Sequence, residues 1–296
     1  MMEQVHPKAV LEQVAAAVPP ECHPNIIVIG SLAVAHQLLG GEEVIPVRTK
    51  DIDCVLSPRI VAVDTAQMLA QALLDAGWHP RKVGRFRDPG GPETPDDQLP
   101  AVRLYPPDST EWFVELLTVP SGKVEGKEWK RLILGRNHYA LPSFEFLSIA
   151  THEPVKTEVG ISCARPEMMA LANLLKHPTI KPELISDTDI KRSNKDLGRV
   201  LAVAFLSEGL AENAMTTWPP IWERALRTQF RVRWKELAGR AGRGMRQLLS
   251  HPEDLEQATE ICNTGILAHR PVTSEQLGLT GRRLLQDAIQ PLEHRG

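Results

Sequence analysis

The hydrophobic pattern of the chain changes its period near residue 160, and this change constrains the fold more than any other sequence feature. Before it, β-branched or alternating runs such as 25–29 and 51–56 are interspersed with helical patterns. After Pro166, apolar residues recur at i, i+3 and i+4 spacing in 167–175, 195–206, 221–237, 252–261 and 274–289. The sequence therefore predicts an α+β chain, with a mixed sheet and flanking helices in a domain at 1–160 and a mostly helical domain at 161–296.

The composition is that of an ordinary globular protein. With 296 residues the chain is long enough for about two domains of roughly 150 residues each. Hydrophobic residues make up 42% and charged residues 24%, which excludes a wholly disordered or fibrous chain. No apolar run reaches the roughly 18 residues that a membrane-spanning helix needs, and the four cysteines are far apart, as buried reduced thiols would be. We therefore expect a cytoplasmic protein with no membrane partner.

The net charge of −3 conceals an uneven distribution of charged residues. Residues 219–246 hold seven arginines and Lys235 against Glu223 and Glu236, so this segment carries +6 and the rest of the chain −9. A single helix over 221–237 would place four of these basic residues in a stripe beside an apolar face. Such a stripe fits contact with a phosphate backbone, or a solvated surface paired with acids of the remaining chain.

The stretch 88–100 is dense in proline, glycine and acidic residues and is expected to form a loop, with its mobility left open. Two strand candidates follow, 101–105 and 112–118, and the turn-like sequence 106–110 joins them. We expect these strands to form a hairpin.

Gly30 and Ser31 stand where the β-branched run 25–29 meets a helical pattern. A glycine at such a junction lets the backbone approach a ligand closely, and the N–H groups of a helix start favour phosphates. The Ser31 hydroxyl adds a donor at the same place. Similar junctions occur in many α/β proteins, so this motif acquires meaning only in combination with others.

Asp51 and Asp53 begin the strand candidate 51–56 and, being two residues apart, point to the same face. Two carboxylates this close repel each other unless a cation lies between them. Oxygen ligands in this arrangement suit Mg²⁺ or Mn²⁺ bridging the phosphates of a substrate. The alternative is an acidic strand edge that serves solubility, which the apolar residues Ile52 and Val55 disfavour.

Glu115 is the one charged residue in the apolar run 112–118. A buried carboxylate requires a partner or a metal. It is therefore either a third metal-ligating or basic carboxylate beside Asp51 and Asp53, or the partner of an ion pair with Arg103 on the neighbouring strand.

In combination, the runs GSLAVAHQL, RTKDIDCVL and WFVELL resemble the nucleotidyltransferase superfamily, which has the DNA-polymerase-β-like fold. The signature consists of a Gly-Ser helix start, an Asp-x-Asp strand and a later strand with a third carboxylate. The run from Arg48 to Asp53 is similar to the AbiEii-type branch, known from abortive-infection and toxin–antitoxin systems. The resemblance extends well over residues 24–120 and only loosely over the helical half.

This resemblance implies that a nucleoside monophosphate is transferred from a nucleoside triphosphate to an acceptor, with Mg²⁺ or Mn²⁺ as cofactor. It gives Asp51, Asp53 and Glu115 catalytic and metal-ligating roles, and Gly30 and Ser31 contacts with the triphosphate. The implied partners are an RNA or tRNA acceptor, held by the basic segment 221–246, and an antitoxin protein.

Other positions match the family pattern incompletely. Arg48 either meets a phosphate or pairs with Glu42 or Glu43, and the insert 40–46 is expected to form a loop over the site. In the helical half, Lys176, Arg192 and Lys195 are the counterparts of residues that bind the triphosphate. Asn173 stands where the family usually has lysine, and Arg199 where it usually has aspartate, which weakens the case for toxin activity.

Two other functions therefore remain open. One is a non-catalytic member of the fold that binds a nucleotide or a protein. The other is a nucleotidyltransferase that acts on a small hydroxylated molecule. The sequence contains no GxSxG, Walker or GxGxxG motif after a strand, so hydrolase, P-loop and dinucleotide-binding functions have no support.

Overall fold

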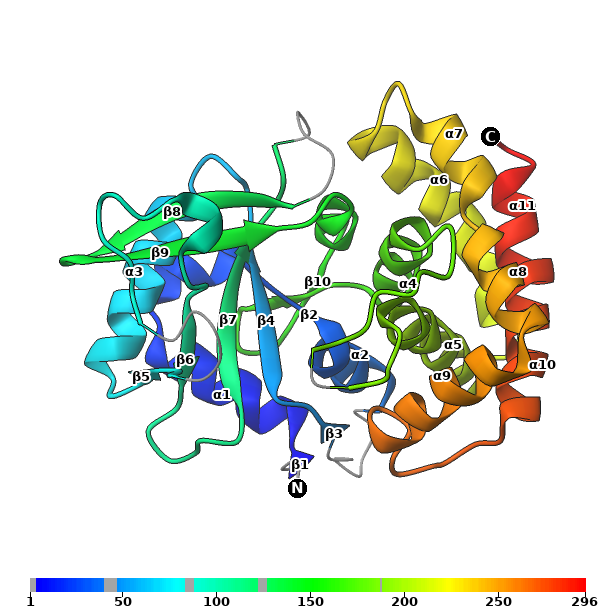
Figure 1. Cartoon of the computed structure of the whole chain (residues 1–296), viewed down its shortest axis with the longest axis horizontal. Helices are drawn as coiled ribbons and strands as arrows, with labels where there is room; N and C mark the ends of the chain where they lie inside the picture. The colour runs from blue at the N-terminus through cyan, green and yellow to red at the C-terminus, as the bar shows by residue number, and fades with distance from the viewer. Residues whose placement is uncertain (1–3, 40–46, 83–87, 122–126, 187) are drawn as a thin grey trace. The chain divides into compact units, whose positions relative to one another are not determined.

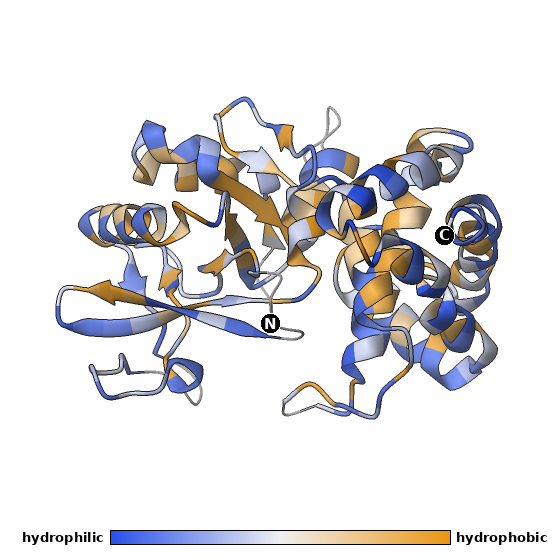
Figure 2. Cartoon of the chain, turned by 90° about the horizontal axis from the view of Figure 1, so that it is seen from above, coloured by the Kyte–Doolittle hydropathy of each residue, from blue (hydrophilic) through white to orange (hydrophobic). Residues whose placement is uncertain are grey.

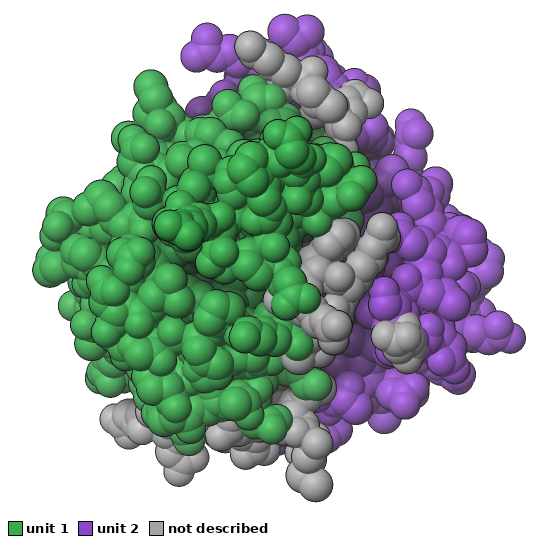
Figure 3. Space-filling view, turned by 60° about the vertical axis from the view of Figure 1, so that its left-hand side comes forward, with its two compact units in different colours: residues 1–33, 49–164 green, residues 34–48, 165–296 purple. Residues whose placement is uncertain are grey.

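The computed structural model describes residues 4–39, 47–82, 88–121, 127–186 and 188–296 and shows an α+β chain with a mixed seven-stranded sheet (Figure 1). The chain divides into two compact units, which are coloured separately in Figure 3: residues 1–33 with 49–164, and residues 34–48 with 165–296. The long segment of the second unit begins at Arg165, near the expected boundary at 160/161. This unit also includes 34–48, which the sequence-based division assigned to the first domain.

The first unit contains the sheet and the helices around it. Its helical elements are α1 (Pro7–Ala17), η1 (Pro20–Asn25), α2 (Gly30–Leu38, which continues into the second unit), α3 (Ala62–Asp75), η2 (Asp96–Gln98) and η3 (Leu147–Thr151). Its strands are β1 (Gln4–Val5), β2 (Ile26–Ile29), β4 (Asp51–Leu56), β5 (His79–Pro80), β6 (Arg103–Tyr105), β7 (Phe113–Thr118), β8 (Glu128–Leu134), β9 (Asn137–Ser143), β10 (Val155–Lys156) and β11 (Ser162–Cys163).

The second unit is mostly helical. Its elements are β3 (Val47–Arg48), α4 (Pro166–Lys176), α5 (Arg192–Leu210), η4 (Ala214–Thr217), α6 (Trp218–Gln229), α7 (Trp234–Arg240), α8 (Arg243–Ser250), α9 (Pro252–Thr264), α10 (Ser274–Leu284), the π-helical turn η5 (Leu285–Ile289) and α11 (Gln290–Glu293). None of the helices in the described part of the chain is both long and apolar enough to cross a bilayer.

The strands of the central sheet follow the order β10-β11-β2-β4-β7-β6-β5. Strand β4 lies in the middle, antiparallel to β2 and parallel to β7. The expected hairpin is confirmed, because β6 pairs with β7 in an antiparallel register. Strand residues alternate between the two faces, so Ile52, Cys54 and Leu116 are fully buried on one face. Figure 2 shows the apolar character of the central strands in orange.

The loop 88–100 is attached to a second hairpin, formed by β8 and β9, which the sequence pattern did not predict. The Arg131 guanidinium on β8 donates hydrogen bonds to the carbonyl oxygens of Gly91, Pro92 and Thr94. It also pairs with the Asp96 carboxylate through Nε at 2.8 Å. One side chain therefore satisfies several backbone acceptors of a loop that has little regular structure of its own.

Helix α5 lies at the centre of the second unit and packs against α4, α8, α9 and α10. Its apolar side chains Leu197, Val200 and Leu201 are fully buried. Trp222 on α6 is also fully buried, and its indole N–H donates to the backbone oxygen of Glu167 at 2.8 Å. The indole therefore adds apolar area without leaving its single donor unsatisfied.

The expected single helix 221–237 is wrong, because the chain leaves the helical conformation between α6 and α7. Phe230 ends α6 with φ −131° and ψ 53°, and the N–H of Arg233 then bonds to the Phe230 oxygen in a turn. Phe230 and Val232 are aromatic and β-branched residues with low helix propensity. The apolar spacing that continued across this point had concealed the break.

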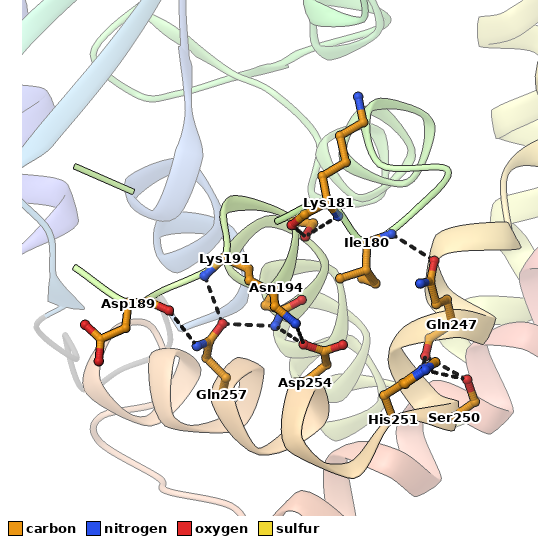
Figure 4. A network of polar contacts seen from close by, with 11 residues as sticks. Ile180, Lys181, Asp189, Lys191, Asn194, Gln247, Ser250, His251, Asp254 and Gln257 are labelled. Atoms are coloured by element: carbon orange, nitrogen blue, oxygen red, sulfur yellow. Dashed lines mark hydrogen bonds and ion pairs between the residues drawn. The ribbon is translucent and has the colours of Figure 1, made fainter. Parts of the chain in front are cut away.

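Buried polar side chains attach the start of α5 to α9 (Figure 4). The Asn194 amide donates to Asp254 Oδ1 at 2.8 Å and to Gln257 Oε1 at 2.9 Å. The Lys191 ammonium approaches the same Asp254 oxygen at 2.6 Å. Burial alone would raise the pKa of Asp254, but the hydrogen bonds from Lys191 and Asn194 and the positive charge nearby lower it below its ordinary value.

All four cysteines are free and buried, as the sequence predicted. Burial raises the pKa of Cys163 to about 12, and the same cause raises that of Cys262 to about 12. These thiols therefore remain protonated and unreactive at neutral pH.

We expect the substitution Arg131→Ala to loosen the loop 88–100 from the β8–β9 hairpin, because the partly buried carbonyl oxygens of Gly91 and Thr94 lose their donor. The loss in unfolding free energy should be about 1–3 kcal/mol, and limited proteolysis should cut within 91–98 faster than in the wild type. Arg136→Ala, at the exposed turn of the same hairpin, is the control. Equal cleavage rates for the two variants would contradict this role of Arg131.

Candidate active site

Four adjacent strands place the predicted site residues of the first unit in one row across the sheet. Asp53 on β4 is paired in register with Ile29 on β2, directly before Gly30, and with Glu115 on β7. Glu115 is in turn paired with Arg103 on β6. Neighbouring strands are about 4.8 Å apart, so these side chains lie next to one another. The structure thus brings together Gly30, Asp53 and Glu115, with Asp51 on the same face of β4.

Gly30 has a backbone conformation that favours glycine and lies close to Asp53. Its φ is +79°, in the left-handed region, and a Cβ atom at this position would be 3.4 Å from Asp53 Oδ2. Ser31 follows as the second residue of α2 and is half-buried. The first turn of a helix, with its partial positive charge, therefore begins beside a carboxylate.

Asp51 is oriented by a residue that lies just before its strand. The buried Thr49 hydroxyl lies 3.2 Å from the Asp51 backbone oxygen and 3.3 Å from Asp51 Oδ1, where it donates a shared hydrogen bond. Asp51 and Asp53 are half-buried, whereas Ile52 between them is fully buried. The two carboxylates therefore share the partly open face of β4.

Glu115 forms the ion pair that was one of its two expected environments. Its carboxylate Oε2 lies 2.8 Å from Arg103 Nε, and the residue is 9% exposed. Within the described ranges, no group of three or more histidine, cysteine, aspartate or glutamate side chains is arranged to hold a metal ion. Glu115 thus has a cationic partner in this conformation, whereas Asp51 and Asp53 share the partly open face of β4.

Aromatic and basic residues that the sequence analysis did not single out continue this face toward the edge strand β5. The rings of His79 and Tyr105 are 5.5 Å apart, and Tyr105 meets Phe113 edge-on at 5.9 Å. The Arg81 guanidinium lies over the Phe113 ring, 4.2 Å from its centroid. The i, i+2 spacing of His79 with Arg81, and of Arg103 with Tyr105, was the signal that could have identified these residues.

One group of expectations falls on the part of the chain that is not described. The insert 40–46, with Glu42 and Glu43, lies outside the described residues. Arg48 belongs to β3, but its side chain is likewise outside the description. The alternatives for Arg48 therefore stay predictions.

The three basic residues expected to bind the triphosphate from the helical half belong to the second unit. Lys176 Nζ is 2.7 Å from Asp196 Oδ2, and Arg192 Nε is 3.0 Å from Glu183 Oε1. Lys195 is half-buried in the first turn of α5. In this conformation Lys176 and Arg192 each contact a carboxylate of their own unit.

Asp196 is the centre of a buried charge cluster at the contact of α4 and α5. His177 Nε2 lies 2.8 Å from Asp196 Oδ2, and Arg199 approaches the other oxygen at 3.8 Å. Burial would raise the pKa of Asp196, but the hydrogen bond with His177 and the charges of Lys176 and Arg199 hold it well below its ordinary range. Arg199 thus contributes to a structural cluster.

The basic segment 221–246 is partly compensated by acidic side chains. Arg227 pairs with Glu223 at 2.6 Å, and both Arg233 and Arg240 approach Glu236 at 3.3 Å. Arg246 pairs with Glu293 on α11. Because the helix is broken after Phe230, Arg227 stacks on Trp234, 4.3 Å from the ring centroid, and does not continue a straight stripe. Three of these four arginines thus pair with the two glutamates of the segment itself, whereas Arg246 pairs with an acid of the remaining chain, as one of the two alternatives expected.

We expect Asp196→Asn to lower the unfolding free energy at neutral pH by about 3 kcal/mol, because Lys176 and Arg199 lose their buried counter-charge. The folded-state pKa of Asp196 lies below its ordinary value of 3.8, so its charge stabilises the fold above about pH 4 and this contribution is lost as the pH falls. Urea unfolding between about pH 7 and pH 2 should show a stability difference between the wild type and the variant that is constant above about pH 4 and decreases below it.

The control for this measurement is Glu183→Gln, since Glu183 is an exposed carboxylate whose ion pair with Arg192 has little effect on stability. A stability difference between the Asp196 variant and the wild type that stays constant down to acid pH would contradict the assignment.

Comparisons of this chain with known proteins found no relative. No protein-family model matches the chain, and searches of curated proteins and of solved structures found no match.

Proposed function

We propose that this protein is a metal-dependent nucleotidyltransferase, which transfers a nucleoside monophosphate from a nucleoside triphosphate to an acceptor. The observation that carries this proposal is the position of Asp53, which lies between Gly30 at the start of α2 and Glu115 on β7. Donors suited to phosphates thus adjoin carboxylates suited to a divalent cation.

The residues present fit such a cation in part. Asp51 and Asp53 are hard oxygen donors on one face of one strand, and Thr49 orients the first of them. Glu115 could join them through Oε2 if Arg103 released that atom, or through its other carboxylate oxygen. Mg²⁺ or Mn²⁺, when bound, would supply positive charge for the phosphates and lower the barrier for attack by the acceptor oxygen.

The chain itself would contribute position and charge. Gly30 allows the backbone N–H groups at the start of α2 to approach the triphosphate, and Ser31 adds a hydroxyl donor. Asp51 and Asp53 would hold the cation against these phosphates. Arg103, beside Glu115, would add a fixed positive charge where negative charge develops during the transfer.

A second candidate function is a non-catalytic nucleotide-binding member of the same fold. The ion pair between Arg103 and Glu115 favours it, because the third carboxylate of the proposed site already has a partner. The resemblance suggests two further proposals, which are transfer to a small hydroxylated molecule and association with an antitoxin protein. No contact among the described residues supports either of them. We also propose a cytoplasmic location, because the composition is that of a globular protein and the cysteines are free and buried.

The decisive experiment uses each nucleoside triphosphate, labelled at its α-phosphate, with Mg²⁺ or Mn²⁺ and either total RNA or a panel of small hydroxylated acceptors. We expect the wild type to transfer label and Asp53→Asn to reduce the rate at least about 100-fold, because one of two ligating carboxylates is lost. Asp64→Asn, on the exposed surface of α3, is the matched control and should retain activity.

The identity of the labelled product separates the acceptors, since label in RNA supports an RNA acceptor and label in a small molecule does not. If no condition gives transfer while nucleotide binding is retained, the non-catalytic candidate replaces the catalytic one.

A further inference from the structure

We propose that the face formed by Arg81, Tyr105 and His79, next to the carboxylates, binds an unpaired end of a nucleic acid acceptor. One base of the acceptor stacks on Tyr105 and His79, and a phosphate contacts Arg81. The role of this face as an acceptor site rests on the proposed function. Its binding of nucleic acid can be measured whether or not transfer occurs.

The surface consists of two neighbouring rows of side chains that cross the same strands. One row contains His79, Tyr105, Phe113 and Asp51, from the edge strand β5 to the central strand β4. In the other row the backbone N–H of Arg81 bonds to the Arg103 oxygen at 2.9 Å, and Arg103, Glu115 and Asp53 follow. Each row therefore leads from the sheet edge to one of the two central aspartates.

The position of these rows suggests that they contact the acceptor and not the triphosphate. Gly30 and α2 lie beyond β4 on the β2 side, whereas Arg81, Arg103 and Tyr105 lie on the β7–β6–β5 side. In an in-line displacement the attacking and leaving groups are on opposite sides of the phosphorus. If the triphosphate leaves toward Gly30, the acceptor approaches over β7 and β6.

The chemistry of this side suits a base and a phosphate together. Exposure increases along the aromatic row, from buried Phe113 through half-buried Tyr105 to exposed His79, so the outer rings are accessible to a ligand. Arg81 is positioned by its stack on Phe113, and its buried Nε has no hydrogen-bond partner among the described residues. Aromatic platforms beside arginines bind single strands, whose unpaired bases can stack.

The basic segment 221–246 is a weaker candidate for the same role. Four of its arginines pair with glutamates of the second unit, as described above. Arg81, in contrast, has no ion pair with an acidic side chain in the described part of the chain. An acceptor phosphate would therefore meet Arg81 without first displacing a carboxylate.

The test measures binding of a fluorescein-labelled single-stranded RNA of about 12 nucleotides, a length typical of single-strand sites, by fluorescence anisotropy without nucleotide or metal. We expect Tyr105→Leu, which keeps an apolar side chain in the strand, to weaken binding roughly tenfold or more. Arg81→Ala should weaken it and lower the slope of log K against log salt by about 0.7, because one phosphate contact is lost.

Two variants control for folding and for unspecific loss of charge. Tyr105→Phe retains the ring and should restore the affinity. Arg136→Ala removes one positive charge from the exposed β8–β9 turn and should leave affinity and salt dependence unchanged apart from a small non-specific effect. Circular dichroism should give the same spectrum for all variants.

Several outcomes would overturn the proposal. They are wild-type protein that does not bind the single strand, variants of Arg81 and Tyr105 that bind as tightly as the wild type, and RNA duplex of equal length that competes as well as the single strand. A loss of binding in Arg231→Glu with none in Tyr105→Leu would instead assign the RNA contact to the basic segment.

The same variants separate this inference from the proposed function. If Asp53→Asn abolishes transfer while Tyr105→Leu leaves the KM for the acceptor unchanged, the proposed function is supported and the proposed acceptor-binding face is rejected. If no transfer is detected but Tyr105→Leu weakens RNA binding, the binding face is supported and the proposed transferase activity is rejected.

Discussion

Compensation of buried carboxylates by neighbouring groups shapes both units of this protein. In the first unit, β4 carries two carboxylates into the middle of an apolar sheet, and its neighbours accommodate them. A glycine rather than a larger residue approaches Asp53, the Thr49 hydroxyl bonds to Asp51, and Arg103 neutralises Glu115. The arrangement of the candidate site thus follows from the cost of moving charge away from water.

In the second unit, buried carboxylates are compensated mainly by basic side chains. Asp196 is buried between α4 and α5, and a histidine, a lysine and an arginine surround it. Asp254 is held similarly by Lys191 and Asn194 at the start of α5. These contacts explain why Lys176 has a structural role in this conformation, whatever ligand the protein binds. They also give Arg199 a structural role beside Asp196.

Local patterns of the sequence were sufficient for the strands and helices that bear the carboxylates. The alternation in 51–56 and 112–118 predicted β4 and β7 and the common face of Asp51 and Asp53, because these features depend on neighbours in the chain. The β8–β9 hairpin was missed, since its residues 128–134 mix polar and apolar side chains without a clear period. The attachment of the loop 88–100 by Arg131 depends on a contact across about 35 residues, which no local pattern encodes.

Other features depended on choices between two environments that the sequence left open. Glu115 was expected either to bind a metal or to pair with Arg103, and only the register of β6 against β7 shows their contact. The surface around Arg81 and Tyr105 was not recognised because β5 has two residues, too few for a periodic pattern. The break after Phe230 was hidden because apolar residues continue at helical spacing on both sides of it.

The parallel pairings of the central sheet have a consequence for synthesis of the chain. Strand β4 cannot meet its partner β7 before residue 118 has been made, and β2 obtains its neighbour β11 only with residues 162–163. Non-local pairings of this kind form late, because a long loop must close before any contact compensates the lost entropy. During translation, the two aspartates therefore leave the ribosome well before the strand that carries their third carboxylate neighbour, and the nascent chain exposes an incomplete sheet edge until nearly the entire first unit has emerged.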